Sequence, residues 1–353
     1  MIEILTSGVA LGVHVPGLLL ADRLREQGVA AEVRVLERLL PKHTLTTTVG
    51  MKWAFHRDFR FALTGQRVAG DPSSAVDGPA VGELMDAWRT GGVDRFVVFS
   101  GFWLRIVKQY LSAGGTPPPV DICHVDSVVS PSFARTGDLV PGARQVWLAD
   151  AARGCVPLSI PVTREAALPW ADRDRRLLVH GGGWGIGTYR ERAQELRERG
   201  FELDIVAYEH ADVRDEEVRY FMVDPDWHPW LDDGYPPFGR VMRDEPPRYT
   251  RGSGHHGSFH LTRAAVATVS KPGGGTLLDS LWAATPTVLL EPFGAHEEQN
   301  TELWQELGFG ITFERWKESG FDMDVIENMH HALRKAVADI PDYSALLAET
   351  GRS

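Results

Sequence analysis

The residues best suited to chemistry lie in one short stretch, Val269 to Ser280, with the sequence VSKPGGGTLLDS. Lys271 precedes three consecutive glycines, and Asp279 follows one turn into the expected helix. Glycines let the backbone approach a ligand closely, and the free N–H groups at a helix start suit a phosphate. A carboxylate near such a loop can accept hydrogen bonds from a ribose. The stretch predicts a nucleotide site, whereas the glycines alone would fit a tight turn equally well.

The elements expected around this stretch recur earlier in the chain. A strand from Ala264 to Val269 leads into the glycines, and Thr276 opens an apolar helix. In the same way, a strand from Arg176 to Val179 precedes the glycine-rich loop from Gly181 to Gly187, and a charged helix follows from Thr188 to Arg199. This order of strand, loop and helix predicts βαβ units and a parallel sheet.

The N-terminal half has the same alternation. We expect a helix from His14 to Gln27 between two strands, and a weakly periodic helical segment from Thr44 to Leu63. The strands expected in this half are Ile2 to Leu5, Glu32 to Leu36, Arg95 to Phe99, Val120 to Val125 and Gln145 to Leu148. The proline-bearing segment 157–174 interrupts the alternation and is typical of a linker. The chain is therefore predicted to hold domains at residues 1–156 and 175–353, with ligands bound where the carboxyl ends of the two sheets face each other.

Composition narrows the classes of function. The 353 residues are 43% hydrophobic and 24% charged, as in ordinary globular proteins, and the formal net charge of −11 argues against a nucleic-acid partner. Two cysteines, Cys123 and Cys155, give neither a disulfide framework nor metal-ligand spacing, so we expect a cytoplasmic protein. The apolar run from Val9 to Ala21 lacks a basic n-region and is too short to span a bilayer.

The spacing around the first stretch resembles a known family. Residues Lys271 to Asp279, followed by Thr285-Pro286, Pro292, Glu297 and Asn300, resemble the donor-site signature of GT-B fold glycosyltransferases. The most similar members are diacylglycerol glycosyltransferases, the lipid II-forming N-acetylglucosaminyltransferase, and natural-product glycosyltransferases. The segment GVHVP, from Gly12 to Pro16, is similar to the G-H-x-x-P segment of that family. The resemblance implies two Rossmann-like doubly wound domains that face each other across a cleft.

The resemblance also implies roles for individual residues. Asp279 would hold the ribose in place of the family's glutamate, and Lys271 would lie near the diphosphate. Residues of two loops would supply the backbone donors for that diphosphate: Gly182, Gly183, Gly185, Gly273, Gly274, Gly275 and Thr276. Residues after the following strand would hold the sugar: His296, Glu297 and Asn300, with Glu298 and Gln299 as a shifted alternative.

The expected catalytic base departs from the family pattern. Val13 occupies the position of the family's histidine, and His14 is the next residue. A shift of one residue turns a helical side chain by about 100°. A helix N-terminus keeps an imidazole neutral, as a general base requires, but His14 could equally be a capping or packing residue. Asp126 and His124 are the alternative bases.

The resemblance thus implies a hexosyltransferase that moves a sugar from a nucleotide diphosphate sugar, UDP-linked, to an acceptor. It implies inversion at the sugar and no cofactor or metal ion. We expect a small soluble acceptor, because the segment 102–110 is more typical of a core helix than of one that contacts a membrane. The alternatives are a nucleotide-sugar hydrolase and a non-catalytic nucleotide-sugar-binding protein. Three D-x-D tripeptides fit chance in an acidic chain, and membrane contact by the amphipathic segment 102–110 is not favoured over a place in the core.

Two further clusters have open interpretations. The histidines His255, His256 and His260 could ligate zinc, but no third ligand is evident in the sequence, which favours an exposed helix start. The irregular segment 224–254 is rich in proline and aromatic residues, among them Trp227 and Trp230. Aromatic faces stack on bases and sugar rings, and a loop packed by its own aromatic residues is an equal alternative.

Overall fold

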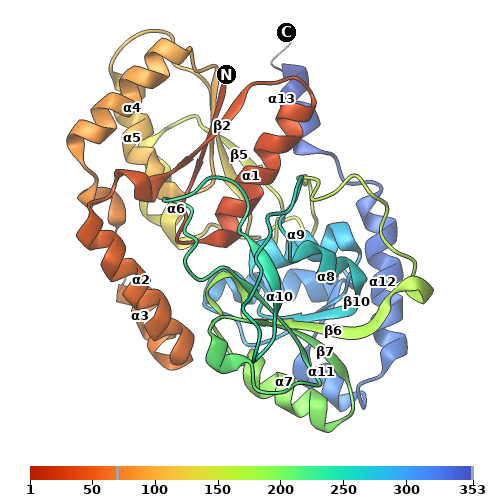
Figure 1. Cartoon of the computed structure of the whole chain (residues 1–353). Coiled ribbons are helices and arrows are strands. Elements are labelled where there is room, and N and C mark those ends of the chain that lie inside the picture. The colour runs from red at the N-terminus through yellow and green to blue at the C-terminus, as the bar shows by residue number, and fades with distance from the viewer. Residues whose placement is uncertain (69–70, 351–353) are drawn as a thin grey trace.

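The computed structural model describes residues 1–68 and 71–350 and consists of two α/β halves, one above the other in Figure 1. The first half contains a parallel five-stranded sheet in the order β2-β1-β3-β4-β5. Its strands are β1 (Ile2–Thr6), β2 (Ala31–Val35), β3 (Arg95–Val98), β4 (Val120–His124) and β5 (Arg144–Trp147). All five strands predicted for this half are present, each within a few residues of its expected ends.

The helices of the first half cover this sheet and extend toward the second half. They are α1 (Leu11–Glu26), α2 (Lys42–Arg57), α3 (Phe59–Val68), α4 (Gly78–Gly91), α5 (Leu104–Ser112) and α6 (Pro131–Thr136). Helix α1 buries a continuous apolar run, Leu18 to Ala21, together with Leu24. The segment predicted as one weak helix is divided into α2 and α3 at Asp58. These two helices descend beside the second half (Figure 1).

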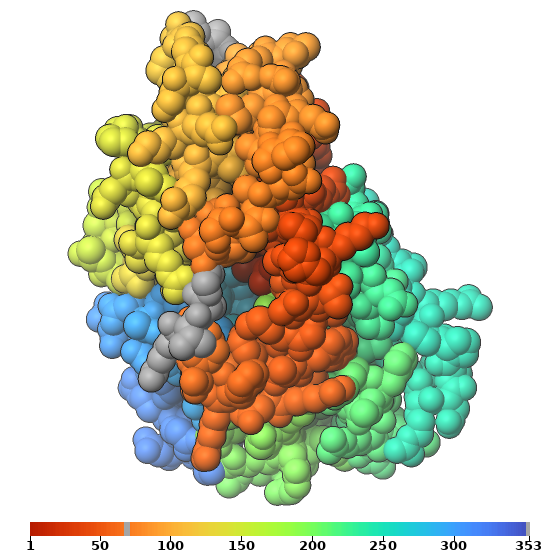
Figure 2. Space-filling model, turned by 90° about the vertical axis from the view of Figure 1, so that its left-hand side faces the viewer, coloured from red at the N-terminus to blue at the C-terminus, as the bar shows by residue number. Residues whose placement is uncertain are grey.

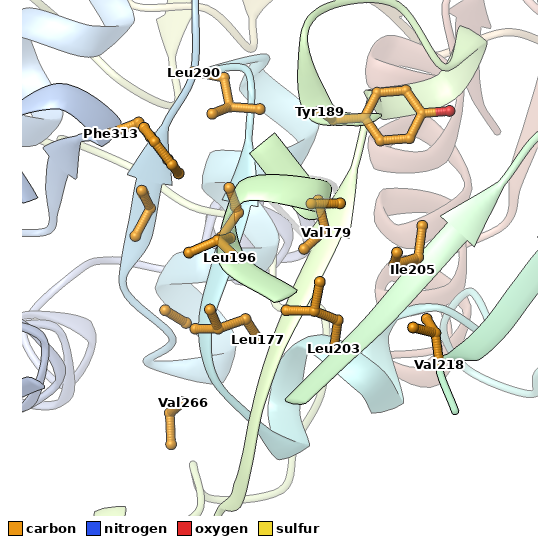
Figure 3. Close-up of a cluster of buried hydrophobic side chains, with 14 of the residues drawn as sticks. Leu177, Val179, Tyr189, Leu196, Leu203, Ile205, Val218, Val266, Leu290 and Phe313 are labelled. Atoms are coloured by element: carbon orange, nitrogen blue, oxygen red, sulfur yellow. The ribbon is translucent and has the colours of Figure 1, made fainter. Parts of the chain in front are cut away.

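The second half contains a seven-stranded sheet in the order β12-β11-β10-β6-β7-β8-β9. Its strands are β6 (Asp174–His180), β7 (Glu202–Ala207), β8 (Arg219–Val223), β9 (Phe238–Val241), β10 (Ala265–Ser270), β11 (Thr287–Leu289) and β12 (Gly310–Thr312). All neighbouring strands are parallel except the pair β8 and β9, which is antiparallel. Strand β9 lies inside the segment predicted to be irregular. Buried side chains such as Leu177, Val179 and Leu196 pack the core of this half (Figure 3).

The helices of the second half are α7 (Tyr189–Glu198), α8 (Phe259–Ala264), α9 (Gly274–Ala283), α10 (Ala295–Glu306), α11 (Phe313–Glu318), α12 (Met323–Val337) and α13 (Tyr343–Thr350). The last of these, α13, returns to the first half and lies beside α1 (Figure 1). Tyr343 is fully buried there and donates a hydrogen bond to Asp121 at 2.7 Å. The C-terminus of the chain is thereby joined to the N-terminal sheet.

The segment 157–174, expected to link the two halves, also contacts the first half. Ile160 and Val162 are fully buried in the same core as α1. The guanidinium group of Arg23 donates hydrogen bonds to the carbonyls of Pro161 and Val162, both at 2.9 Å. Among the described residues, no helix has the length and apolar character needed to cross a membrane.

Candidate functional site

The N-terminus of α9 and the lysine before it form the centre of the site. Strand β10 ends at Ser270, and α9 begins at Gly274, so the intervening residues place Lys271 at the carboxyl edge of the sheet. The Lys271 ammonium donates a hydrogen bond to Glu297 Oε1 at 2.6 Å. The other oxygen of Glu297, a residue only 3% exposed, accepts one from the backbone N–H of Phe293 at 2.7 Å. A buried ion pair therefore joins α10 to the loop before α9.

The glycine-rich loop after β6 lies next to this ion pair. A Cβ at Gly182 would stand 3.3 Å from the side chain of Lys271. Gly182 and Gly185 have φ angles of 72° and 62°, in the left-handed region where glycine is favoured. At the end of β6, His180 Nδ1 accepts a hydrogen bond from the Gly182 N–H at 3.1 Å. Burial and the charge of Lys271 lower the pKa of His180 to about 3, so its ring stays neutral.

The first half approaches this loop and α9 closely. The first turn of α1 contacts the first turn of α9, where a Cβ on Gly275 would stand 3.2 Å from Gly12 Cα. A Cβ on Gly183 would stand only 2.9 Å from the side chain of Leu11. A side chain at either glycine would therefore push the halves apart. The backbone of α1, which carries His14, is held against the predicted phosphate loops.

Asp126 of the first half reaches the N-terminus of α9 directly. Its Oδ1 accepts hydrogen bonds from the Gly274 N–H at 3.2 Å and from Asn300 Nδ2 at 2.9 Å. The Asn300 side chain is fully buried, and it also donates to the Pro272 carbonyl and accepts from the Ser127 N–H, both at 2.8 Å. Both N–H donors of the Asn300 amide are therefore occupied by hydrogen bonds to other protein groups. The two halves are joined by a carboxylate at the same helix terminus that suits a phosphate.

The other predicted donor residues have distinct surroundings. Asp279 Oδ1 is 3.0 Å from His256 Nε2, and His256 Nδ1 is 2.8 Å from the Ser258 hydroxyl. The histidine predicted to lie at an exposed helix start is thus only 6% exposed and pairs with the predicted ribose ligand. Thr276 is half-buried in the first turn of α9, and His296 is half-buried in that of α10.

His14, the first candidate base, is buried at 2% exposure within α1. Its Nδ1 is 3.0 Å from the Thr6 hydroxyl, which donates its own proton to the Arg34 carbonyl at 3.1 Å. Thr6 can therefore only accept from His14, so the Nδ1 carries the hydrogen and the Nε2 keeps its lone pair. No protein group among the described residues bonds that Nε2. Burial, with a smaller contribution from Arg38, lowers the pKa of His14 to about 4.

His124, the remaining candidate base, lies within the first sheet. Its Nε2 is 2.7 Å from Gln145 Oε1, and its ring stacks on Trp147 with centroids 3.9 Å apart. Burial lowers the pKa of His124. These contacts give His124 a packing role and direct one ring nitrogen to a neighbouring strand.

A cavity opens between the two halves beside these loops. Its wall comes from five separate segments: the loop from β1 into α1, α2, the glycine-rich loop, residues 207–208 at the end of β7, and the segment 224–230 with Val223 before it. Trp227 lines the cavity and also contacts His14, with ring centroids 6.4 Å apart. The indole N–H of Trp227 is buried and has no hydrogen-bond partner among the described residues. The aromatic residues of the segment 224–254 therefore form part of the cavity wall.

Helix α2 is fastened to the second half by an ionic cluster. His56 Nδ1 is 2.8 Å from the Gly185 carbonyl, and the Arg190 guanidinium bonds both the His56 ring and Asp212, the latter at 3.0 Å from Nε. His56, Glu209 and Asp212 are close enough to share a metal ion. Because Arg190 already bonds two of these three groups, the cluster is better described as an ion-pair network. Figure 2 shows α2 and α3 lying against the second half.

The structure brings most of the predicted site residues into one region. The two glycine loops, Lys271, Glu297 and Asn300 lie together, and Asp126 contacts them across the cleft. Sequence reasoning missed Glu37, whose buried carboxylate accepts from the Ser7 hydroxyl and from the Gly8 N–H, both at 2.6 Å. The sequence offered one signal for Glu37, namely that this acidic residue directly follows the strand predicted from Glu32 to Leu36. Burial raises the pKa of Glu37.

Comparison with known proteins identifies the fold. No family model matches the chain, and no curated protein matches its sequence. The glycosyltransferase SnogD from Streptomyces nogalater is 16% identical, with 99% of this chain and 98% of that chain covered and a TM-score of 0.59. The glycosyltransferase SsfS6 from Streptomyces sp. SF2575, complexed with thymidine diphosphate, is 13% identical over 100% of both chains, with a TM-score of 0.59.

MurG from Acinetobacter baumannii shares the same architecture, at 13% identity over 99% of this chain and 98% of that chain, with a TM-score of 0.54. These similarities extend over both halves of the chain. The predicted fold is confirmed: the chain has the GT-B fold, with neighbours among natural-product glycosyltransferases and MurG.

Proposed function

We propose that this protein is a glycosyltransferase that moves a sugar from a nucleoside diphosphate sugar to a small acceptor. The observation that carries the proposal is the meeting of two elements across the cleft. The N-terminus of α9, with Lys271 before it, lies against the first turn of α1, which carries the neutral His14. In this arrangement the proposed anion site would lie at the helix contact that includes the first turn of α1, and the Nε2 of His14, buried and without a partner among the described residues, would be the base. The fold is shared with glycosyltransferases along nearly the whole chain.

The donor would be bound mainly by the second half. The diphosphate would accept from the backbone N–H groups at the α9 N-terminus and in the loop 181–187, and Lys271 would provide positive charge. Asp279 would bind the ribose, and Glu297 would be the carboxylate nearest to the sugar. The sequence predicts a UDP-linked donor, and SsfS6 and VinC bind thymidine diphosphates. We therefore propose a pyrimidine nucleoside diphosphate.

The proposed reaction is a single displacement with inversion. The acceptor oxygen forms a bond to the anomeric carbon while the bond from that carbon to the diphosphate oxygen breaks, and the diphosphate leaves with the electron pair. The acceptor proton passes to the Nε2 of His14, or to Asp126 as the second candidate base. Lys271 and the backbone N–H groups stabilise the charge of the leaving diphosphate, so the proposed step requires no metal ion.

Time-resolved release of UDP or TDP from the corresponding sugar donors tests this proposal. Release that requires an acceptor supports transfer, release without an acceptor supports the hydrolase alternative, and binding without turnover would exclude both enzymes. Asp279→Ala should weaken nucleotide binding, whereas Asp138→Ala, at an exposed position outside the site, should not. Addition of EDTA should leave the rate unchanged. If neither nucleotide stabilises the protein in a thermal-shift assay, the donor site is wrongly assigned.

A further inference from the structure

The cavity between the halves has an unusually aromatic wall. Trp53 of α2, Trp184 of the glycine-rich loop and Tyr208 after β7 contribute to it, together with Trp227 and Trp230. The ring of Trp230 is stacked on His228, with centroids 4.7 Å apart and an interplanar angle of 8°. Aromatic side chains from four segments favour a flat aromatic ligand, because offset-stacked and edge-to-face ring contacts add to the gain from burying apolar surface.

One of the side chains that line the cavity is a lysine without a counter-ion. Lys52 of α2 lines the cavity, and its ammonium lies 5.7 Å from the ring centroid of Trp53. Among residues 1–68 and 71–350, no carboxylate forms an ion pair with Lys52, and burial alone accounts for the lowering of its pKa. Asp224 also lines the cavity, but its Oδ1 accepts from the Asp226 N–H at 3.0 Å within its own loop. An anionic group on a ligand would supply the partner that Lys52 lacks.

A second polar group in the wall has no partner. Trp227 is 7% exposed, and its indole N–H, which can only donate, bonds no described residue. A buried donor without a partner carries a desolvation cost. The N–H is closed off from solvent in this structure, so a ligand oxygen would remove that cost only once Trp227 has moved. Because Trp227 also contacts His14, such an oxygen would lie near the candidate base.

We propose that the acceptor is a planar aromatic molecule with an acidic substituent, its acidic group paired with Lys52 and its rings stacked on the tryptophans of this cavity. The cavity has a volume of about 40 Å³ in this structure, so it must widen to admit the rings. This inference rests on the proposed function and specifies its acceptor. It also gives the segment 224–230 of the second half a role in acceptor recognition, in addition to the donor site on that half. The hydroxyl that receives the sugar lies on the side of Trp227 and His14.

Three probes separate the parts of this proposal: 6-hydroxy-2-naphthoic acid, 2-naphthol, which lacks the acid, and 4-hydroxycyclohexanecarboxylic acid, which lacks the flat ring. Their binding is measured by titration calorimetry on the parent protein, Lys52→Gln and the matched control Lys42→Gln, an exposed lysine on the same helix. The naphthoic acid should bind at least tenfold more tightly than the cyclohexane acid. Lys52→Gln should weaken the naphthoic acid about tenfold and 2-naphthol less than threefold, and Lys42→Gln should change neither.

Equal binding of the two acids would overturn the aromatic part of the proposal, and equal weakening of the naphthoic acid and 2-naphthol by Lys52→Gln would overturn the role of the charge. Trp230→Leu, which should weaken both naphthyl probes, checks the location independently of Lys52. Nucleotide binding is measured on the same samples. If UDP or TDP binds and transfer to another acceptor occurs while the naphthyl probes fail, the acceptor class is wrong and the glycosyltransferase stands. If the probes bind and no nucleotide does, the proposed function fails instead.

Discussion

Asp126 occupies the helix terminus at which we propose that the donor diphosphate binds. Its Oδ1 accepts from the Gly274 N–H at 3.2 Å and from Asn300 Nδ2 at 2.9 Å. A diphosphate at the same terminus must share or displace this carboxylate, and the two negative charges repel each other. We therefore expect Asp126→Asn to increase nucleotide affinity, because the amide oxygen can still accept both hydrogen bonds while the competing charge is removed.

The size of the effect follows from the helix dipole. A charge at a helix terminus contributes about 0.3–1 kcal/mol when exposed and up to about 2 kcal/mol when partly buried. Asp126 is half-buried, so we take about 1 kcal/mol for the competition. At about 1.4 kcal/mol for each tenfold change, this corresponds to roughly fivefold tighter binding of UDP or TDP.

Isothermal titration of both nucleotides against the parent, Asp126→Asn and Asp138→Asn measures this change, with Asp138 as an exposed control nearby. The reasoning would be refuted if Asp126→Asn bound the nucleotides no more tightly than the parent while melting at the same temperature as the parent. The same variant distinguishes the candidate bases. A fall in kcat of hundredfold or more would assign the base to Asp126, since general-base catalysis contributes about 10² to 10⁴. Retained turnover would leave His14 as the candidate base.

Three further predictions concern stability. Lys271→Met should destabilise the protein by about 3 kcal/mol, because it leaves Glu297 buried and unpaired, and Lys271→Met with Glu297→Gln should recover part of this in urea unfolding. His14→Gln should make stability less dependent on pH between 6.5 and 4. Between pH 6.5 and 4, His14 of the parent binds a proton in the unfolded chain but not in the folded chain, where its pKa is about 4. The free energy of unfolding of the parent therefore falls by up to about 1.4 kcal/mol for each unit by which the pH decreases. Tyr343→Phe should cost about 1.5–3 kcal/mol in the same unfolding assay, because the fully buried Asp121 loses a hydrogen bond.

The local pattern of the chain was enough to predict most strands and the glycine loops, because alternation and glycine runs are short-range signals. Strand β9 was missed because its four residues, Phe238–Val241, follow two prolines and pair antiparallel with β8. Helix α13 was not predicted either; it forms where Tyr343 is buried against the first sheet. In each case the missing information is a tertiary contact that the local sequence does not encode.

The same limit applies to the candidate site. The glycines, Lys271 and Asp279 form a recognisable run, so their chemistry could be inferred from spacing. The contact between Asp126 and Gly274 joins residues 148 positions apart, and no periodicity indicates such a pair. His256 was predicted to be exposed for the same reason, since its partner Asp279 lies 23 residues further along the chain.

The hydrogen bond that fixes His14 also limits the acceptors it can serve. Thr6 is uncharged, so it orients the imidazole without stabilising the imidazolium, and burial holds the pKa of His14 at about 4. A phenol has a pKa of about 10, whereas water, as a guide to an aliphatic alcohol, has about 15.7. The difference of roughly six pKa units corresponds to about 8 kcal/mol less cost for transferring the phenol's proton to the same base. We therefore expect 6-hydroxy-2-naphthoic acid to be glycosylated at least 10³-fold faster than its 6-hydroxymethyl analogue under identical conditions. Comparable rates would show that His14 does not accept the proton.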